Sequence, residues 1–250
     1  MRSSLARLSG AALVGLCALA GGPAVAQQFN SDNYLSKPHG VATLIVTTGQ
    51  QSQTWMTTVS LFPNWELTAA AYLFNDDEDR PTGDGHSTSF YAKWMLHENK
   101  EKTGGFAVKF GGGMKPSYVI DGTAFSSASK TYWTNAPLTL PFLDNRLSWD
   151  FMPGASVTRD EDNAWAFTYS TRLAWYPMSP KLALVGEVYG AEGEADLTPE
   201  YKAGLRWEPN AYANIALTYG NTFDNTPGGS RLEIGVMLFT PPFACIGPCR

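Results

Sequence analysis

The sequence predicts an all-β fold: a transmembrane antiparallel up-and-down β-barrel of about 12 strands, which follows a cleaved signal peptide. Three observations predict it. The chain begins with an export signal, it then repeats segments of roughly ten residues in which apolar and polar side chains alternate, and the connections between these segments are alternately short and long.

Residues 1–26 have the parts of a secretory signal peptide. Arg2 and Arg7 form a basic start, residues 11–20 are apolar, and Ala24-Val25-Ala26 matches a small-residue cleavage site. The apolar stretch is shorter than the roughly 20 residues that a membrane-spanning helix needs. We therefore expect cleavage after Ala26, and a periplasmic N-terminal segment over residues 27–38.

Composition excludes some functions. Without Arg2 and Arg7, the 18 Lys and Arg residues become 16, against 23 Asp and Glu, so the mature chain has a net charge of -7. This balance does not suggest nucleic-acid binding. Because the mature chain has no apolar run of about 18 residues, any span of the membrane must be a closed barrel, the other structure that satisfies its backbone groups in lipid.

Alternating segments bounded by Pro, Gly, Asn or Asp define the predicted barrel, which covers residues 39–240. The candidate strands cover residues 39–48, 53–62, 65–74, 87–96, 105–112, 131–141, 146–156, 164–175, 182–189, 200–208, 211–220 and 231–240. In residues 164–175, for example, Trp165, Phe167 and Tyr169 share one face, and Thr168 and Arg172 share the other.

Charged residues within the candidate strands share the polar face, which in a membrane barrel faces the lumen. The predicted lumen-lining residues are Glu66, Lys93, Lys109, Arg146, Asp150, Arg172, Glu187, Lys202, Arg206, Arg231 and Glu233. Seven of these are basic and four are acidic, so they fit either a slightly anion-favouring passage or a charge network that fills the lumen. The sequence does not choose between the two.

The connections distinguish a membrane barrel from a soluble sandwich. Residues 62–64 and 208–210 are tight turns, whereas residues 75–86 and 113–130 are long and polar, as expected for periplasmic turns and extracellular loops. An even strand count places both termini on the side of the short turns. Aromatic residues beside these turns predict a belt at the lipid headgroups: Trp65, Trp175, Tyr176, Trp207 and Tyr212.

Residues 241–250 follow the last candidate strand as a predicted periplasmic tail. Pro241 and Pro242 prevent the strand from continuing, because proline cannot donate a ladder hydrogen bond. Cys245 and Cys249 are the two cysteines of the mature chain, and in an oxidising compartment their spacing predicts a small disulfide loop.

Four stretches carry a resemblance to a family of small outer-membrane barrels known as transporters or as the MetA-like barrel of a phenol-degradation pathway. They are Tyr91-Ala92-Lys93-Trp94 and the ranges 149–158, 181–190 and 201–210. The resemblance covers most of the mature chain and contains no catalytic motif. It implies a location in the outer membrane of a Gram-negative bacterium, and passage of small molecules, aromatic ones among them.

Two features suggest other chemistry. His86 lies beside Ser87 and Ser89, which invites comparison with barrel phospholipases, but alternation places both serines on the opposite face from the histidine. Asp76, Asp77, Glu78, Asp79 and Asp84 could attract calcium, yet they lack the spacing of a calcium loop and fit a solvated surface loop better. We therefore expect no catalytic residue, cofactor or metal site.

The sequence favours a passive channel or uptake route for small solutes. The alternatives are a non-conducting structural or assembly barrel, for example one that serves polysaccharide export, and a lipid-modifying barrel enzyme. The expected partners are outer-membrane lipids, lipopolysaccharide and the outer-membrane barrel assembly machinery, and the solute is unknown.

Overall fold

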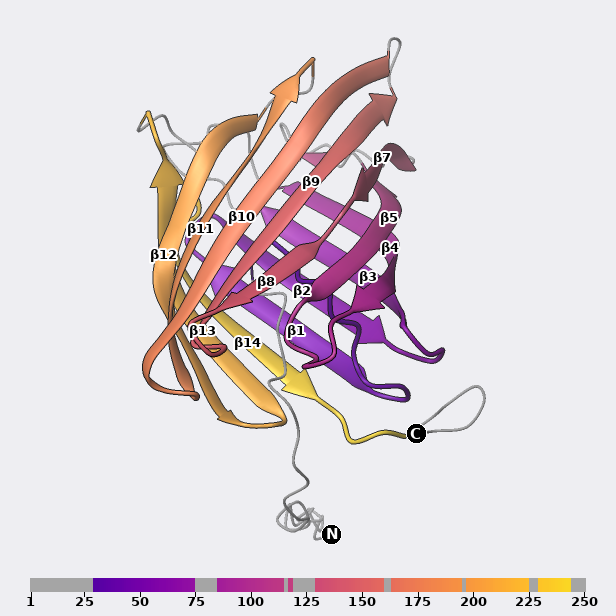
Figure 1. Cartoon of the computed structure of the whole chain (residues 1–250). Helices are drawn as coiled ribbons and strands as arrows, with labels where there is room; N and C mark the ends of the chain where they lie inside the picture. The colour runs from indigo at the N-terminus through magenta and orange to yellow at the C-terminus, as the bar shows by residue number, and fades with distance from the viewer. Residues whose placement is uncertain are drawn as a thin grey trace, which may run out of the picture.

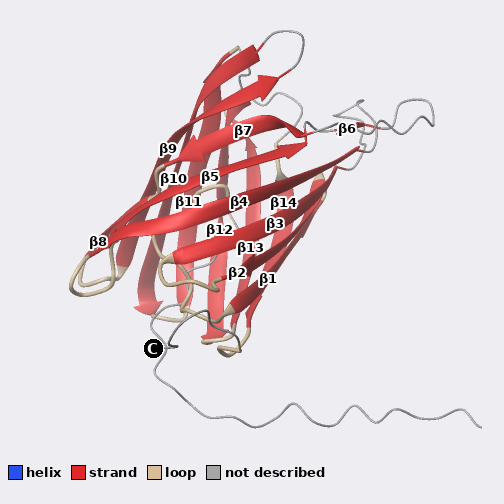
Figure 2. Cartoon of the chain, turned by 90° about the vertical axis from the view of Figure 1, so that its right-hand side faces the viewer, coloured by secondary structure: helices blue, strands red, loops and turns tan. Residues whose placement is uncertain are grey.

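The computed structural model describes residues 29–74, 85–114, 117–118, 129–159, 163–194, 197–224 and 229–243. The described strands form one 14-stranded sheet, which closes into a 12-strand antiparallel barrel (Figure 1). Figure 2 shows strands and loops throughout the described chain. None of the described residues belongs to a helix long and apolar enough to cross a membrane.

The strand bounds agree with the alternating segments of the sequence to within four residues, except that residues 117–118, predicted to lie in a long loop, form a short strand. They are β1 (Ala42–Gly49), β2 (Ser52–Val59), β3 (Trp65–Phe74), β4 (Gly85–Glu98), β5 (Gly105–Met114), β6 (Ser117–Tyr118), β7 (Ser129–Asn135), β8 (Leu138–Phe142), β9 (Leu147–Arg159), β10 (Asn163–Ser179), β11 (Leu182–Gly193), β12 (Leu197–Asn210), β13 (Ala213–Thr222) and β14 (Arg231–Phe239). Pairing of β1 with β14, with Thr43 opposite Phe239, closes the barrel.

One predicted strand, residues 131–141, is divided in the structure into β7 and β8. The division falls at Ala136 and Pro137. Proline has no backbone N–H, so the ladder cannot continue regularly through it. Residues between β7 and β8 still hydrogen-bond to the strands on either side. The N–H of Ala136 donates to the carbonyl of Pro153 on β9, and the N–H of Ala107 on β5 donates to the carbonyl of Pro137. β7 and β8 therefore together occupy one position in the wall.

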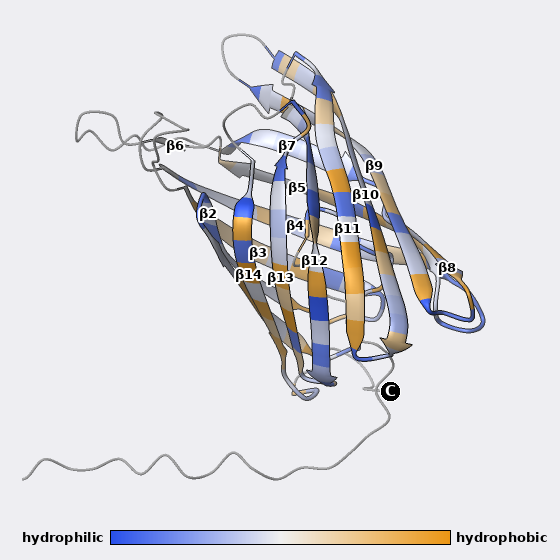
Figure 3. Ribbon diagram, turned by 90° about the vertical axis from the view of Figure 1, so that its left-hand side faces the viewer, coloured by the Kyte–Doolittle hydropathy of each residue, from blue (hydrophilic) through white to orange (hydrophobic). Residues whose placement is uncertain are grey.

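The two faces of the wall differ sharply in polarity. On β14, Leu232, Ile234 and Leu238 are each about half exposed (50%, 49% and 48%), whereas Glu233 is 5% exposed. The same alternation recurs around the barrel, and Figure 3 shows the hydrophobic bands along the strands. An apolar surface of this extent exceeds what a water-soluble monomer normally exposes, and it fits a lipid environment.

The predicted aromatic belt is present except for one residue. Trp175, Trp207 and Tyr212 are exposed on the outer face, and Trp65 stacks on Trp94 with 5.2 Å between the ring centroids. Tyr176 was wrongly assigned to this belt. It follows Trp175 directly, so its side chain points to the opposite face of the wall.

Candidate functional site: a lumen divided by the N-terminal segment

Nine of the eleven charged residues predicted to face the lumen are buried inside the barrel. They are Glu66, Lys93, Lys109, Asp150, Arg172, Glu187, Lys202, Arg206 and Glu233. Arg146 is exposed in the turn before β9, and Arg231 is partly exposed at the first position of β14. The two exceptions therefore lie at the ends of strands, where alternation no longer determines the direction of a side chain.

Two buried carboxylates of the wall were missed in the sequence. Glu200 and Glu208 are 6% and 8% exposed. Both lie on β12 at even spacing from Lys202 and Arg206, so the alternation that identified the basic residues also marks these two. Among the described residues, the buried charges are six basic and seven acidic. The excess of basic charge inferred from the sequence is therefore offset.

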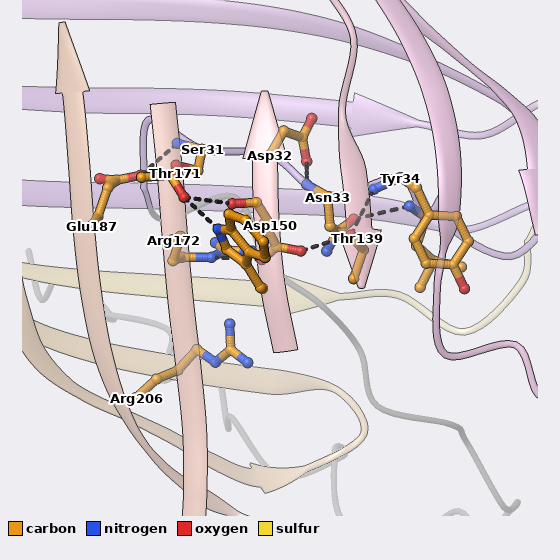
Figure 4. Close-up of polar contacts among 12 residues, drawn as sticks. Ser31, Asp32, Asn33, Tyr34, Thr139, Asp150, Thr171, Arg172, Glu187 and Arg206 are labelled. Atoms are coloured by element: carbon orange, nitrogen blue, oxygen red, sulfur yellow. Dashed lines mark hydrogen bonds and ion pairs between the residues drawn. The ribbon is translucent and has the colours of Figure 1, made fainter. Parts of the chain in front are cut away.

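Most of these charges form ion pairs inside the barrel: Arg172–Asp150 joins the neighbouring strands β10 and β9, Lys202–Glu233 joins β12 to β14, and Arg206–Glu208 lies within β12. Nη2 of Arg172 lies 2.5 Å from Oδ2 of Asp150, and the Nζ of Lys202 lies 2.7 Å from Oε2 of Glu233. Arg206 pairs similarly with Glu208, at 2.9 Å. Because a buried charge without a partner is costly, these pairs stabilise the lumen in one arrangement. Figure 4 shows Arg172 and Asp150, which lie opposite each other on β10 and β9.

The segment before β1 lies inside this lumen. Residues 29–37, here called the plug, are held to the wall mainly through their backbone. The N–H groups of Asn30 and Ser31 donate to the carboxylate of Glu187, at 3.2 and 2.5 Å, and the N–H of Lys37 donates to Glu66 at 2.6 Å. Charge-assisted bonds of this kind are stronger than neutral ones. Two wall carboxylates thus hold the two ends of the plug.

Asp32 of the plug forms ion pairs with two lysines of the wall. Its carboxylate oxygens lie 3.3 Å from the Nζ of Lys93 and 3.5 Å from the Nζ of Lys109. Lys93 also lies 2.7 Å from Glu66. Burial by itself raises the pKa of Asp32, but the charges of the lysines outweigh burial and lower it to about 2. Asp32 is therefore a carboxylate at neutral pH.

Aromatic residues hold the plug at two further points. The ring of Phe29 packs against Ala174, Ala183 and Ala216, small inward-facing residues that leave room for it, and Arg172 lies over the ring at 5.2 Å. Figure 4 shows the second point, where Tyr34 contacts Thr139 of the wall. The N–H of Tyr34 donates to Oγ1 of Thr139 at 3.3 Å, and this hydroxyl in turn donates to Asp150 at 2.6 Å.

This position corrects the expectation that residues 27–38 form a segment outside the barrel. Residues 29–37 lie within it, and residues 27 and 28 are outside the described residues. The physical reason is complementarity: Asp32 of the plug pairs with two wall lysines, and backbone N–H groups of the plug donate to two wall carboxylates. The sequence could not predict this location, because a polar segment without alternation has no periodic pattern that assigns it to the inside of a barrel.

The plug lies between two cavities. The cavity on the side of the short turns has a volume of about 610 Å³, and Tyr34, Arg146 and Arg206 are among its lining residues. The cavity on the side of the long loops has a volume of about 500 Å³, and it is lined in part by Phe29 and Lys109. Both volumes lie in the range of small-molecule sites. Plug residues line both cavities, so the plug separates them.

The residues considered for lipid chemistry lie apart. His86 pairs with Leu73, an outward-facing residue, whereas Ser87 and Ser89 are buried on the inner face. The hydroxyl of Ser87 donates to the carbonyl of Met114 at 2.7 Å. Alternation thus separates the histidine from both serines, as the sequence predicts.

Several expectations fall outside the described residues. These are the signal peptide, the acidic residues Asp76 to Asp79 with Asp84, and the cysteines Cys245 and Cys249. All of them stay predictions. Within the described ranges, no group of three or more His, Cys, Asp or Glu side chains is placed to hold a metal ion.

Comparisons with known proteins give the fold. No protein-family model matches the chain, and no curated protein matches it. Among solved structures, a COG4313 outer membrane channel from Pseudomonas putida F1 aligns with a TM-score of 0.56 at 11% identity, over 85% of this chain and 100% of that one. The KdgM porin aligns with a TM-score of 0.54 at 11% identity, over 79% and 98%.

At such low identity, the likeness establishes the fold alone, that of an outer-membrane β-barrel, and it is consistent with a location in the cell outer membrane. The sequence prediction of the fold class is thereby confirmed. The more specific resemblance, to barrels of phenol-degradation pathways, is matched by no family model.

Proposed function

We propose that this protein is a passive channel or uptake route for small solutes across the outer membrane, and that the plug holds it closed. The observation that carries the proposal is the division of one lumen into two cavities by a segment held through noncovalent contacts. Such contacts can open and close again, whereas a lumen filled by wall side chains cannot clear itself without rearranging the barrel.

The lining of the loop-side cavity supports aromatic molecules among the solutes. Phe29, Tyr72, Tyr91 and Trp133 contribute to it, together with several hydroxyl side chains. Aromatic rings offer a large apolar contact area and prefer offset or edge-to-face packing with other rings. The separation of His86 from Ser87 and Ser89 supports a role without catalysis.

A non-conducting structural barrel is the second candidate, because the ion pairs of the wall and the plug together fill much of the lumen. The two candidates predict different results when the plug is loosened. A channel then conducts, whereas a structural barrel stays closed.

The test is the single-channel conductance of the refolded mature protein in planar bilayers, for the wild type, Glu187→Gln and Glu200→Gln. Glutamine at position 187 still accepts a hydrogen bond but lacks the charge, so docking of the plug should weaken by about 1 kcal/mol and the open fraction should rise about fivefold. Glu200 is a buried carboxylate that lines the loop-side cavity and accepts from the hydroxyl of Tyr189, not from the backbone of the plug. Glu200→Gln is therefore the matched control.

A rise in both variants, or in neither, contradicts the assigned role of Glu187 in holding the plug. If all three folded proteins stay silent at every voltage and pH, the channel proposal is wrong and the structural candidate replaces it.

Acid should also release the plug. In the docked plug the pKa of Asp32 is about 2, against 3.8 for the free group, because Lys93, Lys109 and Lys37 stabilise its charge against burial. A lowered pKa of an acid contributes docking energy above pH 3.8, which is lost as the pH falls through 2. The open fraction should therefore rise about sixfold at pH 3 relative to pH 7.

The ammonium group of Lys37, also in the plug, titrates in a different pH range. Burial lowers the pKa of Lys37 to about 8, although Glu66 opposes this shift. Its protonation therefore does not change between pH 7 and pH 3. The measurement is the open fraction against pH for the wild type and Asp32→Asn. A variant that responds to acid as strongly as the wild type contradicts the assignment to Asp32.

A further inference from the structure

We propose that Lys93 and Lys109 form a binding site for the carboxylate of a solute, and that Asp32 occupies this site as a built-in ligand. A carboxylate solute that enters from the loop side takes the place of Asp32 and thereby releases the plug. This inference rests on the proposed channel function, and it names the solute class and the opening event.

The ion pairs of Asp32 differ from the others in the lumen. Arg172–Asp150, Lys202–Glu233 and Arg206–Glu208 each join two residues of the wall, so they persist whatever the plug does. The carboxylate of Asp32 belongs to the plug and leaves with it. Among the described residues, no carboxylate of the wall forms an ion pair with Lys109. Departure of the plug therefore leaves a buried cation that needs an anion.

The surroundings of Lys109 favour a carboxylate attached to an apolar group. Its Nζ lies 4.4 Å from the ring centroid of Tyr91 and 5.4 Å from that of Trp133. Both rings, together with Met56 and Met152, line the loop-side cavity. The rings hold the ammonium group in place, and they offer an apolar surface beside the charge.

Access to the site is from the loop side. Lys109 lines the loop-side cavity of about 500 Å³, and Asp32 lies 3.5 Å from its Nζ on the plug. Replacement of one carboxylate by another conserves charge, so the exchange leaves no lysine unpaired. A neutral solute of the same shape cannot make this exchange, because it would leave Lys109 without a counter-charge, whereas Lys93 keeps Glu66.

The experiment uses sodium benzoate as the probe, with benzamide as its neutral counterpart and sodium chloride to match ionic strength. Open fractions are measured for the wild type and for Lys109→Met, while binding of benzoate to detergent-solubilised wild type and Asp32→Asn is measured by calorimetry. Lys202→Met removes a lysine from the same cavity that pairs with Glu233 and not with the plug. It is the matched control.

We expect benzoate, but not benzamide, to raise the open fraction of the wild type. The response should be lost in Lys109→Met and kept in Lys202→Met. Asp32→Asn should bind benzoate at least about tenfold more tightly than the wild type, because the competing carboxylate on the plug is gone and the site is always available.

Equal responses to benzoate and benzamide, or a response that survives in Lys109→Met, overturn the inference while leaving the channel function intact. If no protein conducts, the channel proposal fails, and calorimetry still decides the carboxylate site. Equal benzoate affinity in the wild type and Asp32→Asn then overturns it.

Discussion

Replacement of Asp32 by arginine is expected to hold the barrel open. The substitution exchanges a carboxylate for a cation beside Lys93 and Lys109, at a position that is 4% exposed. Breaking a buried ion pair costs about 3 to 5 kcal/mol, and repulsion adds to this. The open fraction in planar bilayers should therefore rise at least about a hundredfold, which corresponds to about 2.7 kcal/mol.

Asn30→Arg is the matched control for this substitution. It places the same cationic side chain in the same segment, but Asn30 is exposed and lies beside the carboxylate of Glu187, which favours a cation. The plug should stay docked in this variant. Asp32→Met tests bulk without charge and should give an intermediate opening. If Asn30→Arg opens the barrel as far as Asp32→Arg does, the ion pairs of Asp32 do not hold the plug.

Replacement of Asp150 by alanine should lower the free energy of unfolding of the barrel by about 3 to 5 kcal/mol. Asp150 accepts from Nε and Nη2 of Arg172 at 3.0 and 2.5 Å, and from the hydroxyl of Thr139 at 2.6 Å. Both side chains of the ion pair are almost fully buried, so the substitution removes the counter-charge of a buried guanidinium group. Guanidinium-induced unfolding in phospholipid vesicles, followed by tryptophan fluorescence, measures the change.

Two further variants separate charge from packing in this measurement. Asp150→Leu combined with Arg172→Met removes both charges and should recover most of the loss, since an apolar pair of similar size replaces a buried ion pair at little cost. Glu101→Ala changes an exposed turn residue and should stay within about 0.5 kcal/mol of the wild type. A double variant as unstable as Asp150→Ala would show that the loss in the free energy of unfolding comes from the packing geometry of the pair and not from its charge.

The barrel wall could be predicted from the sequence because alternation is repeated in every strand. A side-chain period of two assigns each residue to a face, and the burial of Arg172, Glu187 and Arg206 follows directly from it. This alternation no longer determines the direction of a side chain where a strand ends or is interrupted. Arg146 precedes β9, and Pro137 interrupts the ladder between β7 and β8.

The plug could not be predicted in the same way, because a segment without regular structure has no period to detect. The charges of the lumen give no indirect signal either. Of the residues predicted to face the lumen, five basic and four acidic ones are buried, and Glu200 and Glu208 of the wall already outweigh this difference. Asp32 therefore could not have been found by balancing the charges of the strands.

The contacts of the plug also order the events of folding. Asn30 and Ser31 bind Glu187, which lies 157 and 156 residues further along the chain, and Asp32 binds Lys93, 61 residues away. Contacts so distant in sequence form late, because the intervening chain must first be brought into register. The barrel wall around Glu187 must therefore be in place before the N-terminal segment can dock on it. A folding molecule thus passes through an unplugged state on its way to the closed one.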